Sequence, residues 1–125
     1  MWEEFFPRAE IYGMDIAPEV LINKGRIKSF LGDQSNACSL MDTIQKIGGD
    51  FDLIVDDGSH MLEHQILTAH VYLPFVRHGG FYIIEDVNEH PDNVISRLPA
   101  QYRNNIQCHK SRAEPAHAYT IVIYV

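Results

Sequence analysis

The sequence predicts an α/β protein whose strands lie mostly parallel in one sheet. Short runs rich in β-branched and aromatic residues alternate with segments in which apolar residues recur at helical spacing. Such alternation is typical of parallel sheets, because each helix carries the chain back to the start of the next strand. The chain has 125 residues, 46% of them hydrophobic, which is enough for one core. We therefore expect residues 1–125 to form a single domain.

Six runs have the composition of strands, and each of the first four carries an acidic residue at or next to its end. The last run is rich in aromatic and β-branched residues and is expected to add to the sheet as an antiparallel strand. The runs cover residues 9–16, 26–33, 51–57, 81–86, 104–110 and 117–125.

Two segments show clear helical periodicity. The first predicted helix covers residues 40–47 and ends at the glycine pair that follows it. The second covers residues 62–76, where apolar residues recur at steps of four and three, with Ser59 as its cap and the glycine pair 79–80 at its end. A weaker helical pattern covers residues 93–98.

The charge balance excludes some classes of partner. Seventeen acidic residues against ten basic ones give a formal net charge of −7, which argues against nucleic acid or an anionic membrane as a partner. No apolar run approaches the roughly 20 residues that a membrane span needs, and the start lacks the order of a signal peptide. We therefore expect a cytoplasmic protein in which Cys38 and Cys108 stay reduced.

Acidic residues gather at the predicted carboxyl ends of the strands, where the ligand crevice of an open α/β sheet lies. One aspartate at a strand end is usually a turn former, but six acidic residues at one edge favour a site. If the third and fourth strands are neighbours, about 4.8 Å apart, their terminal carboxylates repel one another and require a cation. Oxygen ligands favour a hard ion such as Mg²⁺, Ca²⁺ or Mn²⁺. The six residues are Asp15, Asp33, Asp56, Asp57, Glu85 and Asp86.

His60 lies three residues beyond Asp57, at the turn above the same edge. A neutral imidazole there would accept a proton from a hydroxyl group that a metal polarises. The spacing fits equally well with a histidine that only begins a helix. Both interpretations stand on the residues alone.

A resemblance to a known family rests on residues 51–87, which read FDLIVDDGSHMLEHQILTAHVYLPFVRHGGFYIIEDV. This segment resembles the strand, helix and strand that carry the metal site in one branch of the class I S-adenosylmethionine-dependent methyltransferases. That branch contains macrolide-sugar O-methyltransferases and proteins known as cephalosporin hydroxylases. MWEEFFPRAEIYGMDI (1–16) is similar to the segment after the family's glycine-rich loop, and GDQSN (32–36) to its adenine-contacting turn. DDGSH and IIED at this spacing are the specific motifs.

The resemblance implies a Rossmann-like, three-layer fold and a metal-assisted O-methyltransferase. Asp57, Glu85 and Asp86 match the family's ligands for Mg²⁺, or another hard divalent cation, and His60 matches its general base. The acceptor would be a hydroxyl group of a small molecule or sugar. Its oxygen, deprotonated by His60, would attack the sulfonium methyl group.

The resemblance also implies S-adenosylmethionine as the cofactor and assigns residues to it. Asp15 would bind the ribose hydroxyls, and Asp33 and Gln34 would lie near the adenine. Asp56 would border the methionine end of the cofactor.

The chain departs from this family at its start. Family members begin with a strand and a glycine-rich loop, whereas MWEEFF is similar to the end of the helix that follows that loop. The strand would lie at the centre of the sheet, between those ending at Asp15 and Asp57. Without it, these two strands pair directly, or another chain fills the gap, or the 125 residues are part of a longer protein. An unpaired central edge invites association, so we expect a homo-oligomer.

Two other functions are consistent with the sequence. HMLEH (60–64) fits H-x-x-E-H, a pattern in which two histidines one helical turn apart bind zinc in one class of peptidases. The chain would alternatively be a non-catalytic methyltransferase-like module for oligomerisation or interaction. The acidic set with His60 argues against a purely structural role.

Overall fold

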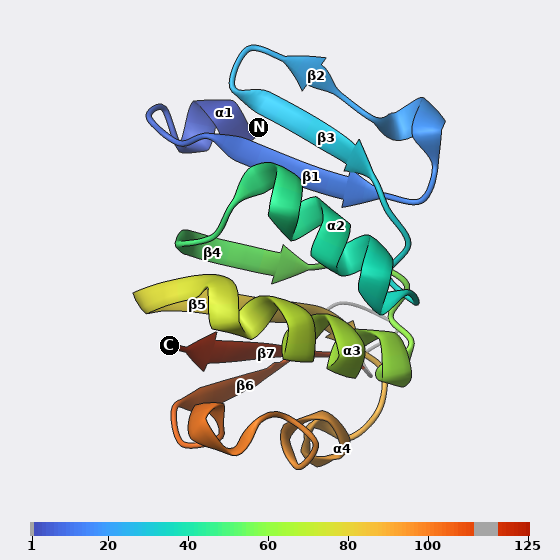
Figure 1. Ribbon diagram of the computed structural model, residues 1–125. Coiled ribbons are helices and arrows are strands. Elements are labelled where there is room, and N and C mark those ends of the chain that lie inside the picture. Colours follow the sequence, from blue (N-terminus) through green and yellow to red (C-terminus); the bar gives the residue numbers. More distant parts are fainter. Residues whose placement is uncertain (1, 112–117) are drawn as a thin grey trace.

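The computed structural model describes residues 2–111 and 118–125 and has an α/β fold with its strands in two sheets (Figure 1). We call β1-β3-β2 the first sheet and β4-β5-β7-β6 the second sheet. The pairs β1–β3 and β4–β5 are parallel, whereas β7 runs antiparallel to β5 and β6. The expected α/β fold with an antiparallel last strand is confirmed, but the strands form two sheets rather than the one expected, and β2 is antiparallel to β3. The strands are β1 Ile11–Asp15, β2 Asn23–Lys24, β3 Ile27–Leu31, β4 Phe51–Asp56, β5 Val76–Val87, β6 Ile106–Lys110 and β7 Tyr119–Tyr124.

The two sheets are not joined by strand pairing. Within the described residues β1 pairs only with β3, and β4 pairs only with β5 and not with β1. Both strands nevertheless point in the same direction (Figure 1). Direct pairing of these two strands, one of the arrangements considered from the sequence, is therefore wrong.

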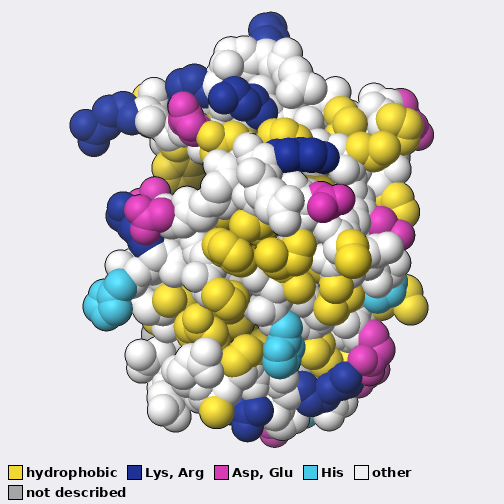
Figure 2. Space-filling model, in the orientation of Figure 1, with side chains coloured by type: hydrophobic (Ala, Val, Ile, Leu, Met, Phe, Trp, Pro, Cys, Tyr) yellow, Lys and Arg dark blue, Asp and Glu magenta, His cyan; other side chains and the backbone are white. Residues whose placement is uncertain are grey.

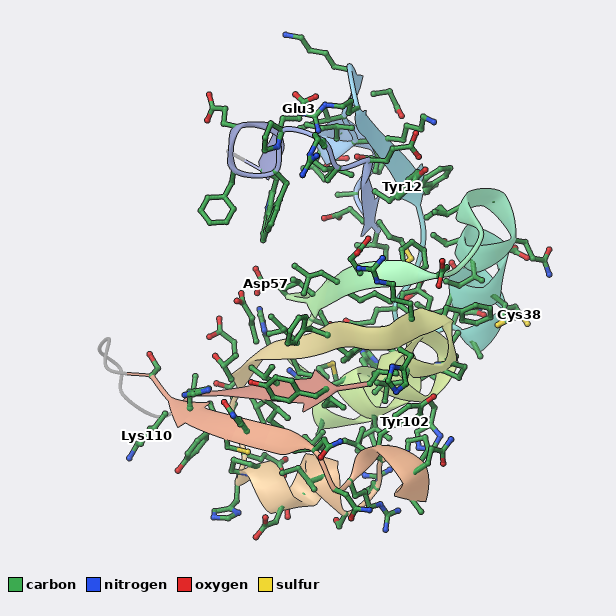
Figure 3. All side chains as sticks on the ribbon, turned by 90° about the vertical axis from the view of Figure 1, so that its left-hand side faces the viewer. Glu3, Tyr12, Cys38, Asp57, Tyr102 and Lys110 are labelled. Atoms are coloured by element: carbon green, nitrogen blue, oxygen red, sulfur yellow. The ribbon has the colours of Figure 1, made fainter. Side chains whose placement is uncertain are left out.

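The helices lie on both sides of the strands. Helices α2 (Ala37–Ile47) and α3 (Leu62–Tyr72) cover one face, and α1 (Trp2–Phe5) lies on the opposite side of the first sheet (Figure 3). Helix α4 (Pro91–Ile95), where the sequence predicted residues 93–98, lies beyond β6 (Figure 1). Every helix in the described part of the chain is too short or too polar to cross a bilayer. Short 3₁₀ turns occupy Pro18–Val20, Leu73–Phe75 and Ala100–Tyr102.

The helix boundaries differ from the predicted ones at several places. Helix α2 begins at Ala37, three residues before the predicted start, and Asn36 is its N-cap residue. Helix α3 ends at Tyr72 and not at Val76, because Pro74 has no backbone N–H to continue the helix. The predicted stop at the glycine pair 79–80 is wrong, since both residues lie within β5. Ser59 is not the N-cap residue, a position that Met61 takes.

The core lies between the second sheet and the helices that cover it. Tyr82, Ile84, Ile121 and Ile123 of β5 and β7 are fully buried on this face. Leu40 of α2 is also fully buried. Figure 2 shows further apolar side chains at the surface of the face that α2 and α3 form. The second sheet is therefore the scaffold that positions the carboxyl ends of β4 and β5. His117, the first residue of the predicted last strand, lies outside the described residues.

Candidate active site

The candidate site lies where β4 and β5 end. These strands are parallel neighbours, and Asp56 is in register with Ile84. Asp57, the residue after β4, and Glu85 of β5 therefore lie at the same level, and Asp86 follows Glu85 within β5. The neighbouring strand ends from which the sequence predicted a cation site are present.

Asp57, His60 and Asp86 form a cluster that is able to hold a metal ion. One potential ligand atom from each residue lies within 4.8 Å of those of the other two. His60 Nε2 is 4.0 Å from Asp57 Oδ1. Two carboxylates and an imidazole suit a divalent cation, and the exposed position of both aspartates leaves room for water or substrate oxygens.

The backbone at this cluster is in an unusual conformation. His60 has φ 57° and Asp86 has φ 49°, both in the left-handed region that residues with a Cβ rarely adopt. Each such residue costs about 1–2 kcal/mol. Strained residues of this kind concentrate at functional sites, where the surrounding structure holds them in place.

His60 also carries a polar atom without a partner. Its Nδ1 is buried and has no hydrogen bond within the described structure. Buried nitrogens normally find a partner, since an unmade hydrogen bond costs about 1–3 kcal/mol. A ring held beside two carboxylates with one nitrogen unsatisfied fits a site that is completed by a bound group.

Glu85 lies beside the cluster but is not one of its three members. Burial, followed by the negative charges of Asp57 and Asp86, raises the pKa of its carboxyl group, whereas His60 lowers it. Its backbone carbonyl accepts a hydrogen bond of 3.1 Å from Gln65 Nε2, which fixes the end of β5 against α3. A cation at the cluster would relieve the repulsion that Glu85 experiences.

Two hollows flank the site. One, of about 230 Å³, is lined by polar residues that include Glu85, Asp86 and Lys110. The other, of about 380 Å³, lies beside His60 and is lined by Met61, Val87 and other residues of the α3 start and the β5 end. The imidazole therefore borders a space in which a substrate hydroxyl group can lie.

Asp15 and Asp33, predicted to contact the cofactor, lie at the carboxyl side of the first sheet. Asp15 Oδ1 accepts a hydrogen bond from the Ala17 N–H at 2.8 Å. Asp33 Oδ1 accepts hydrogen bonds from the N–H and hydroxyl of Ser35, which lower the pKa of this carboxyl group. Both carboxylates stabilise local turns, and neither is part of the metal cluster.

Gln34 and Asp56 contact each other across the interruption between the sheets. Gln34 Nε2 donates to Asp56 Oδ1 at 2.6 Å, and Gln34 Oε1 accepts from the Ser59 N–H at 2.8 Å. Asp56 is only 5% exposed, and burial raises its pKa to about 6 against the opposing effect of its hydrogen bonds. The hydroxyl of Tyr82 also donates to Asp56, at 3.4 Å. Gln34 thus fixes the loop that leads to His60.

Sequence reasoning missed Gln65 and Tyr82. Gln65 is a buried polar residue of α3. Its position next to the apolar Ile66 was the signal in the sequence from which its burial could have been predicted. Tyr82 lies in a run with ordinary strand composition, and nothing in the sequence indicates that its hydroxyl contacts Asp56.

The zinc-peptidase pattern is not formed. His60 precedes α3 and has a left-handed backbone, whereas His64 lies within the helix. His64 Nδ1 lies 2.8 Å from Ser59 Oγ. The two histidines therefore do not share the helical turn that this pattern requires.

The fold and the site together define the class: a Rossmann-like α/β protein with a cluster able to hold a metal ion at the carboxyl end of β4 and β5. No protein-family model matches the chain. Two curated relatives place it further. The mycinamicin VI 2''-O-methyltransferase of Micromonospora griseorubida is 42% identical over 87 residues, which are 70% of this chain and 22% of that enzyme. The demethylmacrocin O-methyltransferase of Streptomyces fradiae is 41% identical over the same share of each chain.

Solved structures agree with these relatives. The MycE methyltransferase of the mycinamycin biosynthetic pathway, in complex with Mg and SAH, matches with a TM-score of 0.72 at 28% identity. The match covers 98% of this chain and 38% of that one. A structure of MycE with Mg, SAH and mycinamycin VI matches with a TM-score of 0.70 at 29% identity.

The chain is therefore homologous to macrolide and sugar O-methyltransferases, and the resemblance stated from the sequence is confirmed. It spans about a fifth of the length of the curated relatives it matches, 22% in each of the two named here.

Proposed function

We propose that this chain carries the metal site of an S-adenosylmethionine-dependent O-methyltransferase that acts on a hydroxyl group of a sugar or other small molecule. The observation that carries the proposal is the cluster of Asp57, His60 and Asp86. It occurs in a chain homologous to sugar O-methyltransferases, including enzymes of Streptomyces olivaceus that act on rhamnosyl tetracenomycins. A solved relative contains Mg and SAH, the demethylated form of S-adenosylmethionine.

In this proposal Asp57 and Asp86 bind Mg²⁺, or another hard divalent cation, and Glu85 adds a third carboxylate. The bound cation would lower the pKa of a chelated hydroxyl group. His60 accepts the hydroxyl proton, which leaves the oxygen free to attack the methyl group of the cofactor. The hollow beside His60 receives the acceptor.

The cofactor would lie along the carboxyl side of the first sheet. Asp15 is exposed there and is assigned to the ribose hydroxyls, and Asp33 to the surroundings of the adenine. Gln34 lies near the same part of the cofactor, with its amide fixed by Asp56 and Ser59. Asp56, although buried, lies under the methionine end.

The proposed partners and cellular compartment rest on the net charge, the cysteines and the free strand edges. The net charge of −7 supports a small-molecule partner over nucleic acid or an anionic membrane. Cys38 and Cys108 are free and exposed, which supports the reducing cytoplasm. The strands β1 and β4, each without a partner strand along one edge in the described residues, support association with a second polypeptide, and a homo-oligomer is one form of it.

The test is calorimetric titration of the purified chain with Mg²⁺ and with S-adenosylmethionine, each alone and together. We expect Asp57→Asn to weaken Mg²⁺ binding by about tenfold or more, because it removes a charged ligand. Asp42→Asn, at an exposed position of α2, is the matched control and should bind like the wild type.

Thermal unfolding of both variants checks that the fold is retained. Equal Mg²⁺ affinity in all three proteins would contradict the metal site. Mg²⁺ binding without any saturable S-adenosylmethionine binding would favour the non-catalytic module over the methyltransferase.

A further inference from the structure

Strand β5 does not keep its regular alternation to its end. Between residues 80 and 84 every second residue is buried, but the next buried residue is Val87 and not Asp86. The pairing with β7 shows the cause, because β5 advances three residues from Ile84 to Val87 while β7 advances two. Strand β5 therefore contains one extra residue, a β-bulge at Glu85 and Asp86.

The bulge determines on which side of the sheet Asp86 lies. Side chains of a regular strand alternate between the two faces, so without the bulge Asp86 would share the buried face with Ile84. The extra residue shifts this alternation by one position, which leaves Asp86 exposed and buries Val87. Asp86 adopts the left-handed φ of 49° within the bulge. Its carboxylate is thereby able to approach Asp57 and His60.

We propose that Gln65 is a positioning residue of this cluster, whose side-chain amide holds the bulge and keeps Asp86 beside the other two members. Gln65 Nε2 donates to the Glu85 carbonyl at 3.1 Å. The register of β5 with β4 ends at Ile84, and its register with β7 passes over Glu85 and Asp86. The amide therefore binds the backbone where the strand ladders on both sides are interrupted. This inference rests on the proposed metal site.

The burial of Gln65 favours a role beyond packing. Its side chain is 2% exposed in α3, the helix that packs across β5 (Figure 1). Burying an amide is unfavourable unless it forms hydrogen bonds, so packing alone would be served better by an apolar residue. Gln65 also lines the hollow beside His60. It thus borders the space that the end of β5 and the imidazole share.

The test compares Mg²⁺ affinity and backbone conformation in matched variants. Gln65→Met has an unbranched side chain of the same length but no amide, so it removes the hydrogen bond to the Glu85 carbonyl with little change in packing. Gln65→Leu, a second apolar replacement, serves if Gln65→Met does not fold. Thr68→Val is the control, because the Thr68 hydroxyl is also buried in α3 but donates to the His64 carbonyl of the same helix. Thermal unfolding of each variant checks that the fold is retained.

Two measurements follow the cluster. In calorimetric titration without an acceptor, Gln65→Met should bind Mg²⁺ about tenfold or more weakly than the wild type, because groups that orient a metal ligand contribute this much to affinity. In NMR without metal, a positive φ brings the amide proton of Asp86 close to its own Hα. The nuclear Overhauser effect between these two protons should be strong in the wild type and in Thr68→Val, and weak in Gln65→Met.

The outcomes separate this inference from the proposed function. An unchanged Overhauser effect at Asp86 in Gln65→Met would overturn the inference, and so would an unchanged Mg²⁺ affinity where the wild type binds Mg²⁺. Equal losses in Thr68→Val would also overturn it, since they would assign the effect to the general packing of α3. A wild type that binds no Mg²⁺ would contradict the proposed function, and the signal of Asp86 would then still decide whether Gln65 holds the bulge.

Discussion

The two sheets of this molecule are built from similar residues but differ sharply in burial. In the second sheet, β5 and β7 contribute Tyr82, Ile84, Ile121 and Ile123, all fully buried. In the first sheet, no residue of β1, β2 or β3 is buried, although these strands contain isoleucine, leucine and phenylalanine. Strand composition is therefore not what separates the two sheets.

The difference lies in how each sheet is held. The second sheet has apolar packing against α2 and α3. The first sheet is held largely by polar contacts. The Arg26 guanidinium donates to the carbonyls of Glu3 and Phe6 at 2.8 and 2.9 Å and ties α1 to the sheet, and Gln34 joins the loop after β3 to the second sheet. The cluster of Asp57, His60 and Asp86 lies at the carboxyl end of the better packed sheet.

The largest test of this comparison is a matched pair of isoleucine truncations. Ile84→Ala in β5 should lower the free energy of unfolding by about 2–5 kcal/mol, because a fully buried side chain leaves a cavity. Ile27→Ala in β3 removes the same atoms from a half-buried position and should cost about 1 kcal/mol. Urea unfolding followed by circular dichroism measures both. Equal losses would show that the first sheet has a packed core of its own.

A smaller effect is expected at the link between the sheets. Gln34→Ala removes one hydrogen-bond donor of the buried Asp56 and the acceptor of the Ser59 N–H, which should cost about 1–3 kcal/mol. Gln45→Ala, at an exposed position of α2, is the control and should change the free energy of unfolding little.

The Gln34 experiment has a second readout in amide exchange. Exchange at Ser59 should become faster in Gln34→Ala, because its acceptor is lost. An unchanged rate at Ser59, with unchanged stability, would mean that the first sheet does not depend on this contact.

The sequence predicted the second sheet better than the first. The spacing of Asp57 and Asp86 at the ends of neighbouring parallel strands located the cluster, because the carboxyl ends of such strands meet at one edge. The two-residue strand β2 was missed, since so short a run leaves no periodic signal. The sequence also did not predict that β1 and β4 are separate, because the composition of a strand does not show which distant strand it pairs with.

Local chemistry explains the other differences. Pro74 ends α3 earlier than the apolar periodicity suggested, because the stripe that continues to Val76 is shared by a 3₁₀ turn and the start of β5. The roles of Gln34 and Asp56 depend on a contact between residues 22 positions apart, which composition and spacing do not reveal.

The smallest predicted effect concerns backbone strain, which is also distributed unequally. The described residues other than glycine with positive φ are Asp50, which directly precedes β4, His60, which lies in the loop between β4 and α3, and Asp86, which lies in β5. His60→Gly removes both the strained conformation and the unpaired Nδ1, so without metal it should stabilise the protein by about 1 kcal/mol. Asp50→Gly, at φ 66° before β4 and away from the cluster, relieves strain alone and should gain less.

Adding Mg²⁺ distinguishes a site from a strained turn in these two variants. A ligand that binds only the native state raises its stability by RT ln(1 + c/Kd), where c is the free ligand concentration, so Mg²⁺ should stabilise the wild type and Asp50→Gly alike. It should stabilise His60→Gly less, because the ring that lies 4.0 Å from Asp57 is lost and the more flexible glycine no longer holds this carboxylate beside Asp86. Thermal unfolding with and without Mg²⁺ measures both effects. If His60→Gly were less stable than the wild type without metal, the left-handed backbone and the unpaired nitrogen of His60 would not lower the stability of the protein, and this prediction would be wrong.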